Sequence, residues 1–214
     1  MDRRVFLLST ASAWAADDSE TWVLDRLDRI GGHPTQAFGT PAVIQTELGK
    51  AVQFDGVEDA LFVDNHPLAG ATNFTWEVIF RPESGGRPEQ RFFHMQEQGS
   101  QSRFLFETRL TGDQWCLDSF VASKAGSQTL IDRKLLHPLD RWYHVAMVYD
   151  GTELRSFVDG RLELSAKVQL APQGPGQTSI GVRYTKVDYF RGVIRLARMT
   201  RSALPPEKFL KLKA

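Results

Sequence analysis

The stretch of the chain from residue 142 to residue 160 constrains the fold more than any other part of the sequence. Val145, Met147 and Tyr149 alternate with their neighbours in the two-residue period of a β-strand. Asp150-Gly151 follows, and glycine readily adopts the positive φ that a tight hairpin turn requires. A second strand-like run comes after this turn. The stretch therefore predicts a β-hairpin.

Similar short apolar runs recur along the chain, separated by turn residues. Residues 74–81 read as a strand that ends at Pro82, and residues 171–176 hold two prolines and two glycines, as expected of a loop. Only residues 204–210 suggest a helix, and a short one. With 214 residues and 42% hydrophobic content, the chain is predicted to form one all-β antiparallel sandwich over residues 17–214.

The net charge and the cysteine content limit the partners and the disulfide bonds that can be expected of this chain. The formal net charge is zero, so no electrostatic argument favours a nucleic-acid partner. Cys116 is the sole cysteine, so no disulfide can form within the chain, and we expect this thiol to be a small buried apolar group.

The first sixteen residues have the features of an export signal. Arg3-Arg4 precedes a short apolar stretch, Val5 to Leu8, and Ala13-Trp14-Ala15 matches the small-x-small cleavage pattern. The apolar stretch is far shorter than the ~20 residues of a membrane-spanning helix. We therefore predict a twin-arginine-type signal peptide over residues 1–16, no membrane span, and export to the periplasm or beyond.

Four motifs, taken in chain order, carry a resemblance to a known family. They are Gly49-Lys50-Ala51 with Phe54-Asp55-Gly56, Phe74-Thr75-Trp76-Glu77 with Arg81-Pro82, the Trp142–Gly160 hairpin, and Phe190-Arg191-Gly192-Val193-Ile194 followed by residues 204–209. Together they resemble laminin-G-like domains of the concanavalin A-like lectin and glucanase superfamily. The resemblance implies a two-sheet antiparallel jelly roll with a short C-terminal helix. Members of this family bind glycans or proteins, and some cut polysaccharides.

One departure from the family pattern bears on metal binding. The family's last strand often carries acidic residues that help to hold a structural calcium ion, but Arg195 stands in that run here. A cation repels Ca²⁺, which prefers oxygen ligands. Asp55, Glu58 and Asp59 remain as weak candidate ligands around one turn. We therefore expect no cofactor and regard structural calcium as disfavoured.

Period-two alternation selects a candidate polar face. His94 and Gln96 share one face of the run 92–97, and Glu107 and Arg109 share one face of the run 103–109. If these runs and residues 74–81 form neighbouring strands, their polar side chains gather into one patch, which late residues could complete. The candidate ligand-binding set is Glu77, His94, Gln96, Glu107, Arg109, Tyr184, Tyr189 and Arg191.

Three functions remain open at this point. The favoured hypothesis is carbohydrate binding, with an extended polysaccharide lying across the concave sheet. The first alternative is polysaccharide cleavage by a lyase or hydrolase with His94, Glu107 and Arg109 as catalytic candidates, since a His–Glu pair offers acid–base chemistry and Arg can neutralise a uronate. The second is a protein-interaction or adhesion module. The same polar residues would equally serve as salt bridges on a solvated face, and His144 is expected to make a structural hydrogen bond.

Overall fold

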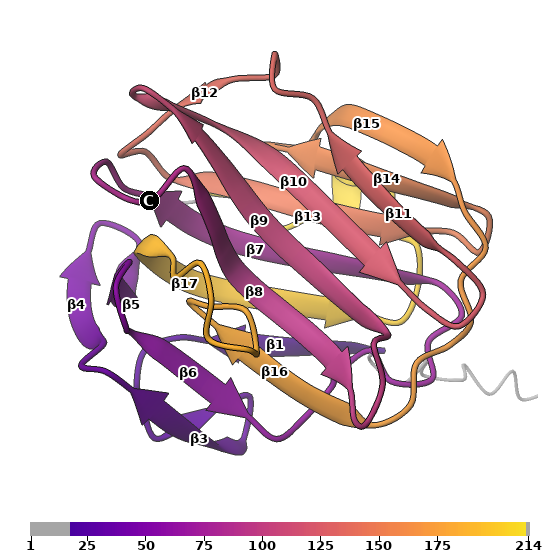
Figure 1. Cartoon of the computed structure of the whole chain (residues 1–214), viewed down its shortest axis with the longest axis horizontal. Coiled ribbons are helices and arrows are strands. Elements are labelled where there is room, and N and C mark those ends of the chain that lie inside the picture. The colour runs from indigo at the N-terminus through magenta and orange to yellow at the C-terminus, as the bar shows by residue number, and fades with distance from the viewer. Residues whose placement is uncertain (1–17, 213–214) are drawn as a thin grey trace, which may run out of the picture.

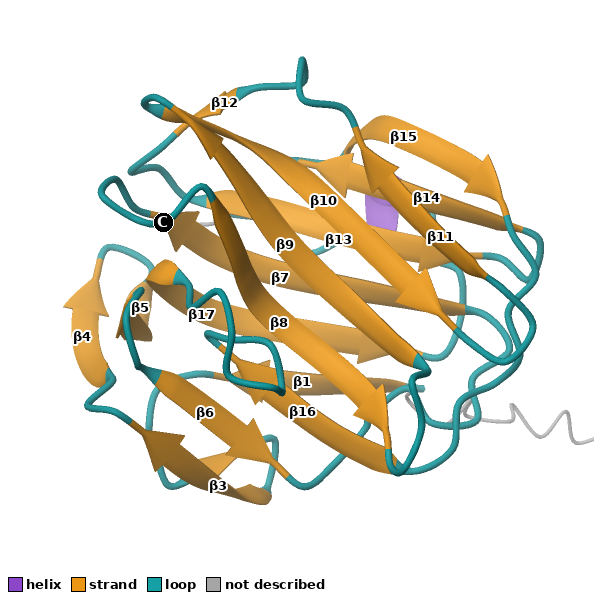
Figure 2. Ribbon diagram, in the orientation of Figure 1, coloured by secondary structure: helices purple, strands orange, loops and turns teal. Residues whose placement is uncertain are grey.

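The computed structural model describes residues 18–212, which form two antiparallel sheets packed face to face (Figures 1 and 2). We name each sheet by a central strand. The β7 sheet has the order β15-β14-β13-β7-β17-β5-β4, with β1 also paired to β17. Its strands are β1 (Ser19–Val23), β4 (Ala42–Thr46), β5 (Gly49–Asp55), β7 (Phe74–Pro82), β13 (Tyr143–Tyr149), β14 (Glu153–Val158), β15 (Arg161–Lys167) and β17 (Arg191–Thr200).

The β8 sheet lies in front of the β7 sheet in Figure 1. Its order is β11-β10-β9-β8-β16-β6-β3-β2, with β12 also paired to β10. Its strands are β2 (Arg29–Ile30), β3 (His33–Phe38), β6 (Ala60–Val63), β8 (Glu89–Glu97), β9 (Arg103–Thr111), β10 (Gln114–Ala122), β11 (Ser127–Ile131), β12 (His137–Pro138) and β16 (Gly176–Ile180). The described residues therefore confirm the predicted two-sheet jelly-roll sandwich.

The predicted hairpin is β13 and β14. The strands pair in antiparallel register from Val145 opposite Val158 to Tyr149 opposite Leu154. Gly151 in the turn has φ +99°, a backbone conformation that favours glycine. Strand β13 also pairs with β7, so this hairpin is built into the middle of its sheet.

Aromatic side chains from both sheets fill the space between them. Trp76 of β7 packs against Phe106 of β9 at a ring separation of 4.3 Å, and Phe80 stacks on Phe92 of β8 at the same distance. All four rings are completely buried. Contacts between aromatic rings add to the free energy of burying their large apolar surfaces, so these rings join the two sheets firmly.

The predicted C-terminal helix is reduced to a single 3-10 turn, Pro206–Lys208. The residues that follow are extended because they are held against the β7 sheet. Phe209 is buried beside Phe157 and His144, and the Leu210 N–H donates a 2.7 Å hydrogen bond to Glu77. Because these contacts hold the backbone in an extended conformation, the helix does not continue beyond Lys208.

The sequence also predicted a signal peptide and no membrane span. The predicted signal peptide, residues 1–16, lies outside the described residues. Within residues 18–212, no helix is long and apolar enough to cross a membrane.

Candidate functional site

The outer face of the β8 sheet gathers most of the predicted polar residues. Phe93 and Met95 of β8 point into the core, which places His94 and Gln96 on the outer face. Glu107 and Arg109 share the same face on the neighbouring strand β9, because Phe106 is in the core. The alternation of the sequence therefore placed these four side chains on one face.

Glu77 does not belong to this group, and the adjacency assumed for it is wrong. Its strand β7 pairs with β13 and β17, so Glu77 lies in the opposite sheet. There it is fully buried, 3.0 Å from Nε2 of His144 and 2.6 Å from Arg198. Strands that follow one another along a jelly roll often alternate between sheets, which the two-residue period of one strand cannot reveal.

The loop between β16 and β17 crosses the outer face of the β8 sheet and is fixed to His94. The backbone N–H of Tyr184 donates a 2.9 Å hydrogen bond to Nδ1 of this histidine. Burial, followed by the positive charges of Arg183 and Arg103, lowers the pKa of His94 to about 3. The imidazole is therefore neutral at pH 7, and because Nδ1 accepts, its proton is on Nε2.

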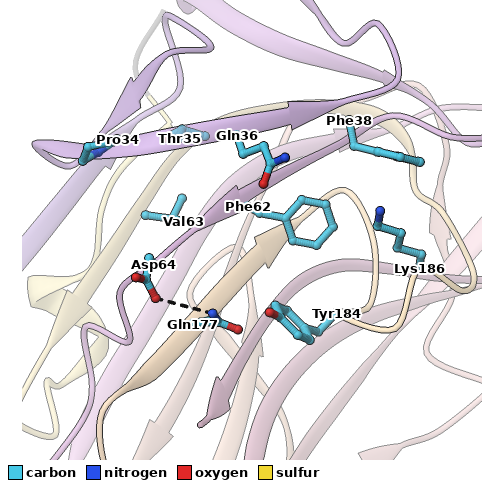
Figure 3. A pocket seen from close by; sticks show the side chains of 10 residues that line it. All are labelled: Pro34, Thr35, Gln36, Phe38, Phe62, Val63, Asp64, Gln177, Tyr184 and Lys186. Atoms are coloured by element: carbon cyan, nitrogen blue, oxygen red, sulfur yellow. Dashed lines mark hydrogen bonds between the residues drawn. The ribbon is translucent and has the colours of Figure 1, made fainter.

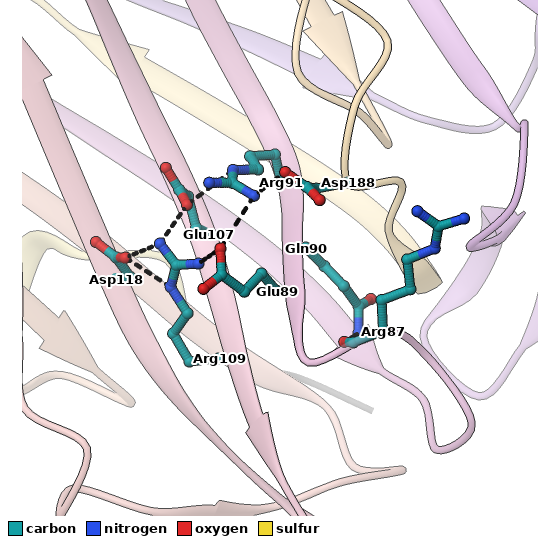
Figure 4. A network of polar contacts seen from close by, with 8 residues as sticks. All are labelled: Arg87, Glu89, Gln90, Arg91, Glu107, Arg109, Asp118 and Asp188. Carbon is teal, nitrogen blue, oxygen red and sulfur yellow. Dashed lines mark hydrogen bonds and ion pairs between the residues drawn. The ribbon is translucent and has the colours of Figure 1, made fainter.

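Glu107 and Arg109 belong to a network of ion pairs that spans three strands and the loop (Figure 4). Arg109 donates to Glu107 at 2.9 Å and to Asp118 of β10 at 2.6 Å. Arg91 of β8 contacts Glu107 at 2.9 Å and also pairs with Asp188 in the loop. Glu89 pairs with Arg109 and lies 3.5 Å from Arg91, so two arginines hold four carboxylates.

Glu107 is the most perturbed acid of this network. Burial, and then the negative charge of Asp118, raise the pKa of Glu107 to about 7, against the opposing effects of Arg91, Arg109 and Arg183. A carboxyl group with this pKa can both donate and accept a proton near neutral pH. In this structure, however, it is paired with arginines, whereas the hydrogen-bond partner of His94 is the Tyr184 backbone. The two catalytic candidates thus have separate partners.

Tyr189 and Arg191 lie away from this group of residues. Arg191 donates to the carbonyl oxygens of Ser84 at 2.8 Å and Asp55 at 3.2 Å, which joins the start of β17 to two loops. Burial and the nearby Glu58 and Asp55 carboxylates raise the pKa of Tyr189. Both residues therefore lie beside the turn after β5. Of the three predicted site residues near the end of the chain, Tyr184 is the one that meets the outer face of the β8 sheet.

Two of the three weak calcium candidates of that turn, Asp55 and Asp59, accept hydrogen bonds from backbone groups. Oδ1 of Asp55 accepts hydrogen bonds from the N–H groups of Val57, Glu58 and Asp59. The carboxylate of Asp59 accepts from the N–H of Thr40 at 2.7 Å and from that of Asp55 at 3.1 Å. These acids close the turn. In the described part of the chain, no group of three or more His, Cys, Asp or Glu side chains is arranged to hold a metal ion.

Sequence reasoning missed a cavity on this face, which we call the aromatic pocket (Figure 3). It has a volume of about 650 Å³ and lies between β3, β6, β16 and the loop. Phe38 and Tyr184 are 38% and 36% exposed there, and the Phe62 ring meets the Tyr184 ring edge-on at 5.9 Å. The lining residues are Pro34, Thr35, Gln36, Phe38, Phe62, Val63, Asp64, Gln177, Tyr184 and Lys186.

Polar groups lie beside these rings. The Lys186 ammonium lies 3.7 Å from the centroid of the Phe38 ring, a cation–π contact. Asp64 and Gln177 form a long hydrogen bond of 3.5 Å on the opposite side of the pocket. The sequence Ala60-Leu61-Phe62-Val63 contained evidence for this pocket. Leu61 and Val63 are in the core, so Phe62, which alternates with them, lies on the outer face of the sheet. Phe62 lies with Phe38 and Tyr184 in one apolar patch, and such a patch, unlike a single exposed ring, indicates an interaction site.

The two stacked antiparallel sheets, with their strand order, define a jelly-roll domain, and this domain has a solvent-accessible pocket on one outer face. The chain belongs to the concanavalin A-like lectin/glucanases superfamily, whose family model matches residues 55–208. A sequence search of curated proteins finds no match.

Solved structures share this fold at low sequence identity. Domain 4 of AbnA, a GH43 extracellular arabinanase from Geobacillus stearothermophilus solved in complex with arabinotriose, has a TM-score of 0.67 and 16% identity, over 88% of this chain and 94% of that domain. The ligand-binding domain of botulinum neurotoxin serotype D, solved with N-acetylneuraminic acid, has a TM-score of 0.68 and 14% identity over 89% of this chain. The binding domain of Paraclostridial mosquitocidal protein 1 has a TM-score of 0.65 and 11% identity over 90% of this chain. The chain spans 49% and 51% of these two toxin domains.

Proposed function

We propose that this protein binds carbohydrate on the outer face of the β8 sheet, with the aromatic pocket as the primary subsite. The observation that carries the proposal is the pair of exposed rings, Phe38 and Tyr184, beside the polar side chains of Asp64 and Gln177. A pocket with aromatic surfaces and a few polar groups suits a sugar, which has apolar C–H faces and hydroxyl groups around its rim. Two of the structural neighbours were solved with bound sugars, which agrees with this proposal.

The same face supports an extended ligand. Gln177 of β16 is in register with Gln96 of β8, and Gln96 is in register with Arg103 of β9. These side chains form a polar row across three strands that begins in the aromatic pocket. A polysaccharide crossing the strands would meet hydrogen-bonding groups at each step.

Isothermal titration calorimetry against a panel of neutral and acidic polysaccharides tests the proposal. Tyr184→Ala is expected to weaken binding about ten-fold or more, the effect of removing an aromatic anchor. The loop should keep its position, because Tyr184 contacts His94 through its backbone. Leu162→Ala, which removes a 55% exposed side chain from β15 of the other sheet, is the matched control and should bind as the wild type does. Wild-type affinity in Tyr184→Ala would contradict the proposal.

Polysaccharide cleavage is the second candidate, favoured by the pKa of Glu107 near 7 and by Asp118 opposite it on β10. The same polysaccharide panel, assayed for new reducing ends and unsaturated uronates, tests this candidate. Activity that is lost in Glu107→Gln would establish an enzyme, and no new ends on any substrate would leave binding as the function.

Export through the twin-arginine-type segment remains part of the proposal. Fusing residues 1–16 to a reporter that is active only after export tests it, with Arg3→Lys/Arg4→Lys as the control. Loss of export in the double variant would support the proposal, and equal export from both fusions would contradict it.

A further inference from the structure

Two arginines on the outer face of the β8 sheet lack an acidic partner. Arg91 and Arg109 are each paired with carboxylates. Arg103 of β9 and Arg183 of the loop differ, since neither forms an ion pair with a carboxylate anywhere in residues 18–212. Glu107 acts on both guanidinium groups through space, but it is already paired with Arg91 and Arg109. A partly buried guanidinium without an ion-pair partner of its own is unusual, because its burial costs free energy that a paired anion would offset.

These two arginines lie together beside His94. The Arg103 guanidinium lies over the Phe120 ring at 4.6 Å, and Phe120 is in register with Leu105, whose other neighbour is His94. Arg183 directly precedes Tyr184, which is hydrogen-bonded to the same histidine. Burial is the largest effect that lowers the pKa of Arg103 and the pKa of His94. The positive charge of Arg183 is the second largest effect in both cases.

The group presents hydrogen-bond donors that have no acceptor. Nε of Arg103, Nε of Arg183 and Nε2 of His94 are each buried without a partner. The imidazole Nε2 carries the ring proton, because Nδ1 accepts from Tyr184. Burying a donor without a partner is unfavourable, and the two like charges repel each other. What the cluster lacks is a negatively charged acceptor.

We propose that Arg103, Arg183 and His94 form a subsite for a carboxylate or sulfate group of an acidic glycan. This inference rests on the proposed carbohydrate-binding function and narrows its ligand class. A guanidinium matches the planar, two-oxygen edge of a carboxylate and also binds sulfate oxygens. A cavity of about 530 Å³, whose lining includes Arg103, Phe120 and Lys124, opens at the Arg103 side of the cluster and gives an anion a route to this arginine.

The position of the subsite defines the kind of glycan. Arg103 lies two strands away from Gln177 in the polar row, which is roughly 10 Å at the usual spacing of strands. A charged group bound at Arg103 therefore belongs to a different sugar residue from the one in the aromatic pocket. The ligand is a linear acidic oligosaccharide that lies across β9, β8 and β16.

Matched pairs of polymers test the subsite by calorimetry. Polygalacturonate is compared with its fully methyl-esterified form, and dextran sulfate with dextran, so that carboxylate and sulfate are separated. Wild-type protein should bind at least one charged polymer more tightly than its neutral partner. Arg183→Gln and Arg103→Gln should each weaken that binding about ten-fold or more, the usual effect of losing a charge-assisted hydrogen bond, and Arg183→Gln should leave binding of the neutral polymer unchanged. Arg155→Gln on β14 of the other sheet removes the same charge and should have no effect.

A spectroscopic measurement checks the role of His94 without a substitution at this buried position. The Nε2–H resonance of His94, observed in ¹⁵N-histidine-labelled protein at pH 7, should shift on addition of the charged oligosaccharide and not of the neutral one. Equal affinity for charged and neutral polymers, or wild-type affinity in both arginine variants, would overturn the subsite. If Tyr184→Ala still weakened binding about ten-fold or more in that case, carbohydrate binding would stand while the acidic subsite failed. If the wild type bound none of the polymers, both proposals would fail.

Discussion

Nε2 of His144 lies 3.0 Å from Oε1 of Glu77, and both side chains are buried on the outer side of the β7 sheet beneath the C-terminal segment. Burial raises the pKa of Glu77, but hydrogen bonds from His144, Arg198 and the Leu210 N–H outweigh this effect and lower it. The carboxylate is therefore ionised and binds three donors. It links β7 to its two neighbouring strands and to the C-terminal segment. The role of the Glu77–His144 pair is therefore structural rather than catalytic.

Glu77→Gln should lower the free energy of unfolding by about 3 kcal/mol, because it leaves the partly buried Arg198 without its counter-charge. Urea unfolding at pH 7 measures this change. Glu153→Gln, which breaks the exposed pair with Arg155, is the control and should cost less than about 1 kcal/mol. Equal costs for the two variants would show that the buried carboxylate is not required.

Gly181→Ala should destabilise the fold far more than Gly151→Ala, although both glycines have positive φ, of +83° and +99°. A Cβ at position 181 would lie 2.4 Å from the Phe54 ring, whereas position 151 has open space. Backbone strain alone costs about 1 kcal/mol or a little more, and steric overlap in the core adds about 1–3 kcal/mol. Thermal unfolding of the two variants separates these effects, and similar melting temperatures would contradict this account.

The sequence predicted the sandwich and the faces of its strands because both depend on local period and turn chemistry. His94, Gln96, Glu107 and Arg109 share a face as expected, since each pair lies within one strand and the two strands form a hairpin. Glu77 could not be placed in the same way, because its sheet is set by pairing with β13, where its partner Ala146 lies 69 residues later in the chain. The aromatic pocket depends on a loop that brings Tyr184 beside Phe62, and no periodic pattern specifies where such a loop lies.

The stability of the wild type should fall as pH rises through the window set by Glu107. The unfolded carboxyl titrates near 4.5 and the folded one near 7, so between these values the folded protein holds a proton that the unfolded chain has lost. Unfolding free energy therefore decreases across this window, by about 3 kcal/mol in all for this group.

Glu107→Gln should flatten this dependence, because glutamine does not titrate. Urea unfolding of both proteins at intervals from pH 4.5 to pH 8 gives the difference in stability, in which the other groups largely cancel. The free energy of unfolding of the variant, relative to that of the wild type, should increase as pH rises. A difference that stays constant across the range would exclude a raised pKa for Glu107.

Asp188→Asn should loosen the loop that forms one wall of the aromatic pocket. Asp188 pairs with Arg91 and has φ +57°, a conformation that asparagine also tolerates, so the change removes the charge with little backbone strain. Amide hydrogen exchange at residues 183–187 should then become faster, and the affinity for any glycan that the wild type binds should fall several-fold, because the loop must be ordered on binding. Asp28→Asn, which breaks an exposed pair with Arg26, is the control and should leave both measurements unchanged. If exchange accelerates while affinity holds, the loop is fixed by the ion pair but does not contribute to ligand binding.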